Sequence, residues 1–422
     1  MKTGEGGEHQ QLKEYNIGYL PSITSIPATC IAFFGDGNRR TRRHKRKTKR
    51  KTKRREEYTK TKEGSIMYIM NQNATKEQIN ELCSAIRDKG LKVTVVDGES
   101  QSTIHPIGDE AGLDLESLAG MDGVQKFISV QGGLRIVKRA NHPEYNTTKV
   151  KPVRIGKDYP VTIGGNGGLT VIAGPCAVQT YEQTLEVAEA VKASGAHILR
   201  GGTRKPRSSP HSDQGNLEER TEILVEVGRK VGMPVMTEVL DPRDMDYLAG
   251  RVDAVWTGAR NAGNMELYKE AGRQSDIPVL IKNNFKGAVV DEWLSAAEYV
   301  AGEGNTNIGL IYRGEAIPPA KGNREGIFDS KKLVEVQRES YLPMIVDPSH
   351  ASGRNWYVEH LVNSSVGLPG VSALMIEVIP ENAGDADIKS DYQHAVRPSQ
   401  FGPMIEKARK LYSIAHDNTH KE

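Results

Sequence analysis

The C-terminal two thirds of the chain repeat one pattern, a short apolar run followed by an amphipathic stretch. Several of these runs are separated by segments with helical periodicity, such as Tyr181–Ser194, Leu217–Val231 and Glu292–Gly302. Eight strand–helix alternations over roughly 240 residues are typical of a (β/α)8 TIM barrel. We therefore expect an α/β protein in which residues 169–422 form such a barrel. The eight expected strands are Leu169–Ala173, Ile198–Leu199, Pro234–Thr237, Ala254–Thr257, Pro278–Ile281, Ile308–Ile311, Pro343–Val346 and Ala373–Ile376.

A smaller unit precedes the barrel. Thr75 and Gln78 form a capping box that opens an amphipathic helix over Lys76–Lys89, and a shorter helix is expected at Leu115–Met121. With the strands, the order β-α-β-β-α-β predicts a small α+β ferredoxin-like domain, residues 67–135. A unit this small without a catalytic cluster indicates a regulatory or interaction role. A linker, residues 136–168, follows with a hairpin around Val153–Ile163. The expected strands are Met67–Met70, Lys92–Val96, Thr103–Gly108 and Val124–Val130.

Residues 1–66 differ from the rest in charge, with 17 Lys and Arg against 7 Asp and Glu. Within Arg39–Arg55, 13 of 17 residues are basic. Such a block repels itself and has no apolar period, so we expect a disordered basic extension over residues 1–66. We interpret it as a solvated tail, or as sequence upstream of a start at Met67. Nucleic acid would bind it at most weakly, by counterion release.

Composition excludes several classes of protein. Apolar residues make up 37% and charged residues 26%, which is ordinary for a globular protein with a core. No run of 18 apolar residues exists, so we expect no membrane partner. Three cysteines are too few for a disulfide framework and indicate a reducing compartment, hence the cytoplasm.

Polar side chains follow almost every expected strand of the barrel. The carboxyl ends of barrel strands meet at one mouth, where such enzymes carry out their chemistry. A single Lys or Arg after a strand is usually a solvated loop residue, but this many together favour a site. The residues are Cys176, Arg200, Glu238, Arg260, Lys282, Arg313, Asp347 with His350, and Glu377, in strand order.

These residues divide into two chemical groups. Cationic side chains sharing one cavity would repel one another unless anions bind between them, so phosphorylated or carboxylated substrates are expected. A thiolate, an imidazole and carboxylates suit a borderline divalent cation such as Mn, Fe, Co or Zn. The cationic group is Arg200, Lys205, Arg207, Arg260, Lys282 and Arg313, and the metal group is Cys176, His350, Glu377 and, as the best later acidic residue, Asp391.

Six motifs in order resemble one family, the 3-deoxy-D-arabino-heptulosonate 7-phosphate (DAHP) synthases of type I that carry an N-terminal ferredoxin-like domain. The resemblance extends over about residues 67–413. The motifs are Gly174-Pro-Cys176, Arg200-Gly-Gly202, Lys205-Pro-Arg207-Ser-Ser-Pro210, Gly258-Ala-Arg260-Asn261, Asp347-Pro-Ser-His350 and Met375-Ile-Glu377-Val378.

The resemblance implies a transferase that condenses phosphoenolpyruvate with erythrose 4-phosphate and releases phosphate, the first step of the shikimate route to chorismate and the aromatic amino acids. It implies that Arg207 and Ser208 hold the aldose phosphate, with Asp347 near its hydroxyls. The phosphoenolpyruvate ligands would be Arg200, Lys205, Arg260, Lys282 and Arg313, and the metal ligands Cys176, His350, Glu377 and Asp391. We expect Lys205 to protonate the forming alkoxide, and Glu238 with Lys282 to orient the attacking water.

The resemblance also implies Tyr or Phe as a feedback effector at the N-terminal domain, and a homodimer or homotetramer. The sequence departs from the common family pattern at Ala177, Gln179, Asn283, Asn284 and Tyr312. Asp385 and Asp387 are alternatives to Asp391 as a metal ligand.

Other functions remain as alternatives. One is a related 3-deoxy-octulosonate 8-phosphate synthase using arabinose 5-phosphate, although Lys205-Pro-Arg207 favours the four-carbon acceptor. The others are a nucleic-acid-binding protein and a barrel without catalytic activity.

Overall fold

The computed structural model describes residues 65–98, 101–130, 132–145, 149–165, 167–207, 209–287, 289–316 and 326–416. The basic segment Arg39–Arg55 and Ser208 lie outside these residues, so the predictions made for them stay predictions. The chain divides after Thr61, and everything described here belongs to the unit Lys62–Glu422. Within the described ranges, none of the helices has the length and apolarity that a membrane span requires.

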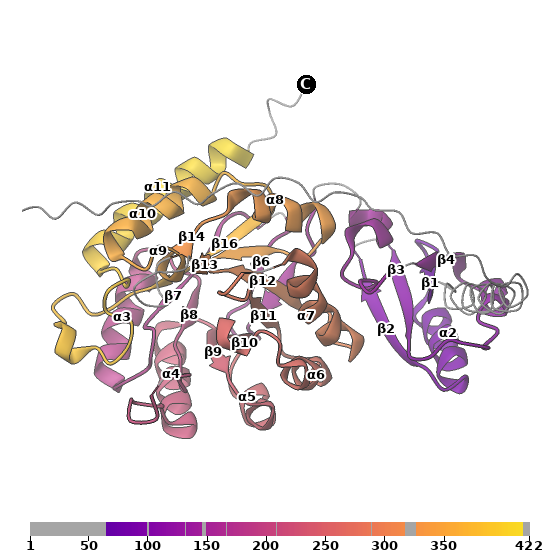
Figure 1. Cartoon of the computed structure of the whole chain (residues 1–422), viewed down its shortest axis with the longest axis horizontal. Helices are drawn as coiled ribbons and strands as arrows, with labels where there is room; N and C mark the ends of the chain where they lie inside the picture. The colour runs from indigo at the N-terminus through magenta and orange to yellow at the C-terminus, as the bar shows by residue number, and fades with distance from the viewer. Residues whose placement is uncertain are drawn as a thin grey trace, which may run out of the picture. The chain divides into compact units, whose positions relative to one another are not determined.

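Eight parallel strands close into a barrel, which confirms the predicted TIM-barrel fold (Figure 1). They pair in chain order, and β16 closes the barrel by pairing with β7. The strands are β7 (Thr170–Gly174), β8 (Ile198–Arg200), β9 (Val235–Val239), β10 (Ala254–Thr257), β11 (Val279–Lys282), β12 (Ile308–Tyr312), β15 (Met344–Val346) and β16 (Val371–Glu377).

Helices surround this barrel (Figure 1). The expected spans at Tyr181–Ser194, Leu217–Val231 and Glu292–Gly302 correspond to α3, α4 and α7. The helices are α3 (Tyr181–Ala193), α4 (Leu217–Val231), α5 (Met245–Ala249), α6 (Met265–Arg273), α7 (Val290–Gly302), α8 (Ser330–Glu339), α9 (Pro348–Ser352), α10 (Asn355–Ser365) and α11 (Pro398–His416).

The barrel strands separate two apolar layers because successive side chains point to opposite faces. On β10, Val255 packs outward with the helices, whereas Ala254 and Trp256 join the cluster inside the barrel. The predicted hairpin forms from β5 (Val153–Ile155) and β6 (Val161–Ile163), and its apolar side chains join the inner cluster. The Thr170 hydroxyl at the start of β7 donates to the Thr162 carbonyl over 2.9 Å, so the hairpin lies at the amino-terminal end of the barrel.

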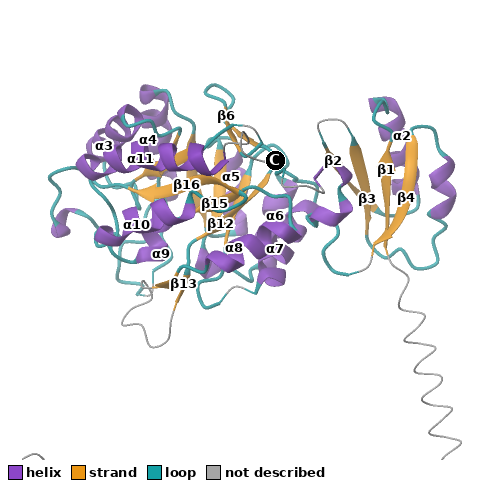
Figure 2. Ribbon diagram, turned by 90° about the horizontal axis from the view of Figure 1, so that it is seen from above, coloured by secondary structure: helices purple, strands orange, loops and turns teal. Residues whose placement is uncertain are grey.

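The smaller domain is the predicted ferredoxin-like unit. Its antiparallel sheet has the order β2-β3-β1-β4, and α2 covers one face (Figure 2). The elements are β1 (Ser65–Met70), α2 (Lys76–Asp88), β2 (Lys92–Asp97), β3 (Ser102–Ile107) and β4 (Val124–Val130). The capping box of Thr75 and Gln78 is present, and Cys83 lies in this domain's core. The second predicted helix is only a 3-10 turn, Glu116–Gly120, and the glycines at 120 and 123 have low helix propensity, which disfavours a longer helix.

Two charged side chains, the half-buried Glu298 and the buried Arg139, join the linker after β4 to the barrel helices. The Glu298 carboxylate of α7 accepts hydrogen bonds from the backbone amides of Arg135, Ile136 and Val137. The Arg139 guanidinium donates to four carbonyls, among them those of Gln337 and Ser340 at the end of α8. These contacts satisfy backbone groups that an irregular segment would otherwise leave unpaired.

Candidate active site

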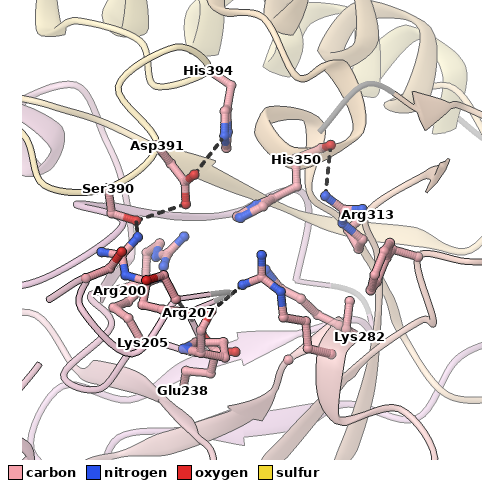
Figure 3. Close-up of a pocket in the computed structure, with 17 residues that line it drawn as sticks. Arg200, Lys205, Arg207, Glu238, Lys282, Arg313, His350, Ser390, Asp391 and His394 are labelled. Atoms are coloured by element: carbon pink, nitrogen blue, oxygen red, sulfur yellow. Dashed lines mark hydrogen bonds and ion pairs between the residues drawn. The ribbon is translucent and has the colours of Figure 1, made fainter. Parts of the chain in front are cut away.

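A cavity of about 270 Å³ opens at the carboxyl ends of the barrel strands (Figure 3). Arg200, Lys282 and Glu377 are the last residues of β8, β11 and β16. Glu238 was expected after its strand but lies within β9, which continues two residues beyond the predicted end. All six predicted cations line the cavity together: Arg200, Lys205, Arg207, Arg260, Lys282 and Arg313.

Hydrogen bonds to main-chain and side-chain oxygens hold three of the cations in place. Arg313 donates to the His350 carbonyl over 3.2 Å, Arg207 donates to the Ser390 hydroxyl over 3.1 Å, and Arg260 donates to the Pro206 carbonyl. Burial lowers the pKa of Arg313, but a guanidinium remains protonated at neutral pH. The cavity is therefore strongly positive and suits a ligand with more than one anionic group.

Two buried ion pairs lie in the floor of the cavity. Arg200 donates to the Glu377 carboxylate over 2.8 Å, and the two side chains are 1% and 0% exposed. The Lys282 ammonium lies 2.7 Å from the Asp347 carboxylate. Because buried charges need partners, each carboxylate offsets the cost of burying its cation.

Asp347 occupies a different place from the one expected. It is fully buried and is not among the residues that line the cavity, so its carboxylate supports the site from behind rather than facing a ligand. One oxygen lies 2.7 Å from His350 Nδ1, and the other accepts the His350 backbone amide at the start of α9. Burial opposes ionisation of Asp347, but His350 and Lys282 outweigh it and hold its pKa well below the usual range.

The four predicted metal-binding residues lie together. Cys176 Sγ is 2.8 Å from Asp391 Oδ2, and His350 Nε2 is 3.6 Å from Glu377 Oε1. Among the described residues, two overlapping groups that share Glu377 have donor atoms within 4.8 Å of one another. Asp385 and Asp387 are exposed instead, so Asp391 is the acidic residue of this loop that reaches the cluster.

The donor set fits a divalent cation. Oε2 of Glu377 is buried and has no hydrogen-bond partner among the described residues. Burial, together with Asp391 and Glu377, raises the pKa of the Cys176 thiol, which therefore keeps its proton until a cation replaces it. Sulfur, nitrogen and oxygen donors in one buried cluster match the preference of borderline metals.

His394, which the sequence pattern did not single out, lies in the same cluster. Its ring is 1% exposed, with Nδ1 3.4 Å from Glu377 and Nε2 3.2 Å from Asp391. Figure 3 shows the ring beside Asp391, and it packs edge-on against His350. The spacing Asp391-x-x-His394 was the available signal, but the segment has no periodicity that would give its side chains a direction.

Lys205 and Glu238 lie next to each other in the wall of the cavity, with Nζ and Oε2 4.0 Å apart. Burial disfavours the charge of Lys205, but the carboxylates of Glu238, Asp391 and Glu377 raise the lysine pKa, so an ammonium is present at neutral pH. A Cβ at Gly258 would lie 1.8 Å from Glu238 Oε1. Glycine at this position is therefore what makes room for the Glu238 carboxylate.

Several departures from the family pattern support the site indirectly. The Asn283 side chain accepts the Arg313 backbone amide over 2.8 Å, and Gln179 accepts the Lys389 amide in the loop that carries Asp391. Tyr312 packs with the outer helical layer, and its hydroxyl accepts the Asp329 amide. None of these residues displaces a cation or a metal-binding candidate.

The comparisons with known proteins agree with this geometry. Residues 145–411 match the DAHP synthetase I family, and residues 67–132 match the DAHP synthase ferredoxin-like domain. The phospho-2-dehydro-3-deoxyheptonate aldolase of Thermotoga maritima is 32% identical over 346 residues, which is 82% of this chain and 97% of that protein. A 2-dehydro-3-deoxyphosphooctonate aldolase of Nitrobacter hamburgensis is 26% identical over 60% of this chain and 92% of its own length.

Solved structures give the same result. The crystal structure of the Thermotoga maritima DAHP synthase matches with a TM-score of 0.61 and 32% identity, covering 83% of this chain and 98% of that one. A truncated form of the Thermotoga enzyme matches with a TM-score of 0.57 over 67% of this chain and 98% of its own. The ferredoxin-like domain and the eight-stranded barrel follow one another along the chain in the order of the two family matches. This chain therefore belongs to the DAHP synthase family of enzymes.

Proposed function

We propose that this enzyme condenses phosphoenolpyruvate with erythrose 4-phosphate and water, giving DAHP and inorganic phosphate as the first step of the shikimate pathway to chorismate and the aromatic amino acids. One observation carries the proposal. Six cations line a single cavity of about 270 Å³ together with His350, Asp391 and His394, which belong to the cluster of sulfur, nitrogen and carboxylate donors. Two phosphorylated substrates would neutralise the cations of this cavity, and one divalent ion would neutralise the carboxylates and the thiolate.

We assign the two substrates to different sets of cations. Arg200, Lys205, Lys282 and Arg313 are buried, and with the exposed Arg260 they would bind the phosphate and carboxylate of phosphoenolpyruvate. Arg207, which is tied to the loop at Ser390, would bind the phosphate of the aldose, with Ser208 beside it. Asp347 then acts by fixing Lys282 and His350, in place of the contact with aldose hydroxyls that the sequence suggested.

Cys176, His350, Glu377 and Asp391 would hold one divalent ion, Mn, Fe, Co or Zn. When bound, the ion supplies Lewis-acid polarisation of the aldehyde. His394 lies against two of these carboxylates and keeps them in place. The carboxylate of Asp347 likewise fixes the orientation of the His350 ring, as outer carboxylates commonly do for metal-binding histidines.

The reaction joins two carbon centres and breaks one carbon–oxygen bond. C3 of phosphoenolpyruvate attacks the aldehyde carbon, and the aldehyde oxygen takes a proton. Water adds to C2 and loses a proton, giving a C2 hydroxyl. The bond from C2 to the former enol oxygen then breaks, the hydroxyl becomes the C2 carbonyl, and the phosphate leaves with that oxygen and the hydroxyl proton. The cations around the phosphoryl group stabilise its charge throughout, because they are already in position before the reaction begins.

Lys205 would donate the proton to the aldehyde oxygen, since an alkoxide is far more basic than an amine. Glu238, with Lys282, would orient the water and accept its proton. Lys205→Met and Glu238→Gln should each reduce kcat at least tenfold, and phosphoenolpyruvate binding is measured separately because Lys205 is also one of its proposed ligands. Full activity in either variant would remove that residue from the mechanism.

The test of the proposed function measures phosphate release by the full chain reconstituted with each metal. Erythrose 4-phosphate and arabinose 5-phosphate are compared as acceptors in the presence of phosphoenolpyruvate. Preference for erythrose 4-phosphate supports the proposal. Preference for arabinose 5-phosphate would assign the related octulosonate synthesis, and no release with any metal would leave a barrel without this activity.

The same family membership supports the remaining proposals. We place the enzyme in the cytoplasm as a homodimer or homotetramer, with Tyr or Phe acting as a feedback effector through the ferredoxin-like domain. The assay above, repeated with each amino acid and combined with light scattering, tests both. A chain lacking residues 1–64 should keep its turnover, since every residue proposed to act lies after them.

A further inference from the structure

Trp256 lies directly beneath the cations of the cavity. It is on β10, its side chain points into the barrel, and it is 1% exposed. Arg200 Cζ is 4.7 Å from the centre of its ring, and Lys282 Nζ is 5.8 Å from it. Both distances are within the range over which a cation is attracted to an aromatic face. One indole therefore contacts two cations that come from different strands, β8 and β11.

Each of these cations already has one carboxylate partner, Glu377 for Arg200 and Asp347 for Lys282. Another carboxylate in place of the ring would neutralise the charge that an anionic ligand needs. A purely apolar side chain would leave the cations without attraction on that side. Arg200 Nε is buried and has no hydrogen-bond partner among the described residues, which agrees with a guanidinium lying against a ring.

An aromatic face avoids both difficulties, because it attracts the two cations without carrying a formal charge that would neutralise them. We propose that Trp256 is a positioning residue of the anion site: its indole face holds Arg200 and Lys282 in place and leaves their charge available to the phosphate and carboxylate of phosphoenolpyruvate. This inference rests on the proposed function for the identity of the anion.

The test compares Trp256→Phe with Trp256→Leu. Both are smaller than tryptophan, so both lose packing, but only phenylalanine keeps an aromatic face. We expect the Kd for phosphoenolpyruvate, measured by calorimetry, to stay within about threefold of wild type in the Phe variant. In the Leu variant it should rise about tenfold, equivalent to about 1.4 kcal/mol, and KM should rise while kcat changes much less.

A second measurement does not depend on the Leu variant folding. Fluorinated tryptophan has nearly the size of tryptophan but a less negative ring face. Incorporated into wild type, it should weaken phosphoenolpyruvate binding progressively as fluorines are added. The labelled Trp256→Phe variant, which still carries label at Trp293 and Trp356, should show no such trend.

Equal Kd values for the Phe and Leu variants, or binding that is independent of fluorination, would overturn the role of the ring. These results are distinct from failure of the proposed function. A wild type that binds phosphoenolpyruvate but releases no phosphate would contradict the reaction and leave the tryptophan comparison valid. If the wild type has normal turnover but the Trp256 variants bind phosphoenolpyruvate equally well, only the inference about the ring is contradicted.

Discussion

Replacing Asp347 by Asn tests how much of the site depends on one buried carboxylate. Asn has the same shape and keeps an oxygen for the backbone amide of His350, but it removes the negative charge 2.7 Å from the Lys282 ammonium. Lys282 is 5% exposed, so water replaces the lost partner only in part. Removing one member of a buried pair costs about 3–5 kcal/mol. We expect a loss of that size in the free energy of unfolding at neutral pH.

The pH dependence of the same variant follows from the pKa of Asp347, which lies well below its usual range because His350 and Lys282 outweigh burial. A carboxyl whose pKa is lowered by folding stabilises the protein above its unfolded pKa of about 4 and loses that contribution as the pH falls through the folded value. The acid limb of the wild-type stability curve should therefore be steeper than that of Asp347→Asn.

Urea unfolding of Asp347→Asn, Lys282→Met and the double variant measures this coupling. Removing both partners eliminates the unpaired charge, so the double variant should be more stable than the sum of the single losses predicts, by about 1–3 kcal/mol. A Mn²⁺ titration should show about 10–100-fold weaker binding in Asp347→Asn, because His350 loses its orienting carboxylate. A single variant within 1 kcal/mol of wild type, with an unchanged acid limb, would refute the reasoning.

Three further predictions concern other parts of the protein. Burial lowers the pKa of His142 to about 4, so its neutral ring stabilises the fold above about pH 6.5 and that contribution, about 3 kcal/mol, is lost as the pH falls toward 4. Urea unfolding across this range should be flatter in His142→Phe, and an identical slope would contradict the assignment. Cobalt-loaded wild type should show a thiolate-to-cobalt absorption band that Cys176→Ser lacks, and a band that survives the substitution would exclude the sulfur as a ligand. Gly258→Ala should displace Glu238 and reduce phosphate release more than tenfold, whereas Gly250→Ala, where a Cβ meets nothing within 4 Å, should not; equal activities would count against the proposed role of Glu238.

Much of the fold could be predicted because the barrel strands are short, buried and apolar. Ala254–Thr257 matches β10, and the other seven strands differ from their predicted ends by one to two residues. The grouping of the cations followed from topology alone, since parallel strands bring their carboxyl ends to one mouth.

Side-chain direction within turns and loops was the part that sequence could not supply. Asp347 follows a strand as the other site residues do, but the turn into α9 directs its carboxylate inward onto Lys282 and His350. His394 lies in an irregular segment whose path is fixed by tertiary contacts. Trp256 has the parity of an inward-facing residue on β10, but its contact with two cations depends on how residues from β8 and β11 extend across the barrel.

The hairpin of β5 and β6 has a consequence for how substrates enter the barrel and how products leave it. Its apolar side chains fill the amino-terminal end of the barrel, while the cavity opens at the opposite end. Because one end of the barrel is closed, substrates and products must pass through the same opening at the other end. Departing phosphate would pass the very arginines that attract the next phosphorylated molecule, so release of the first product and capture of the following substrate compete for one passage.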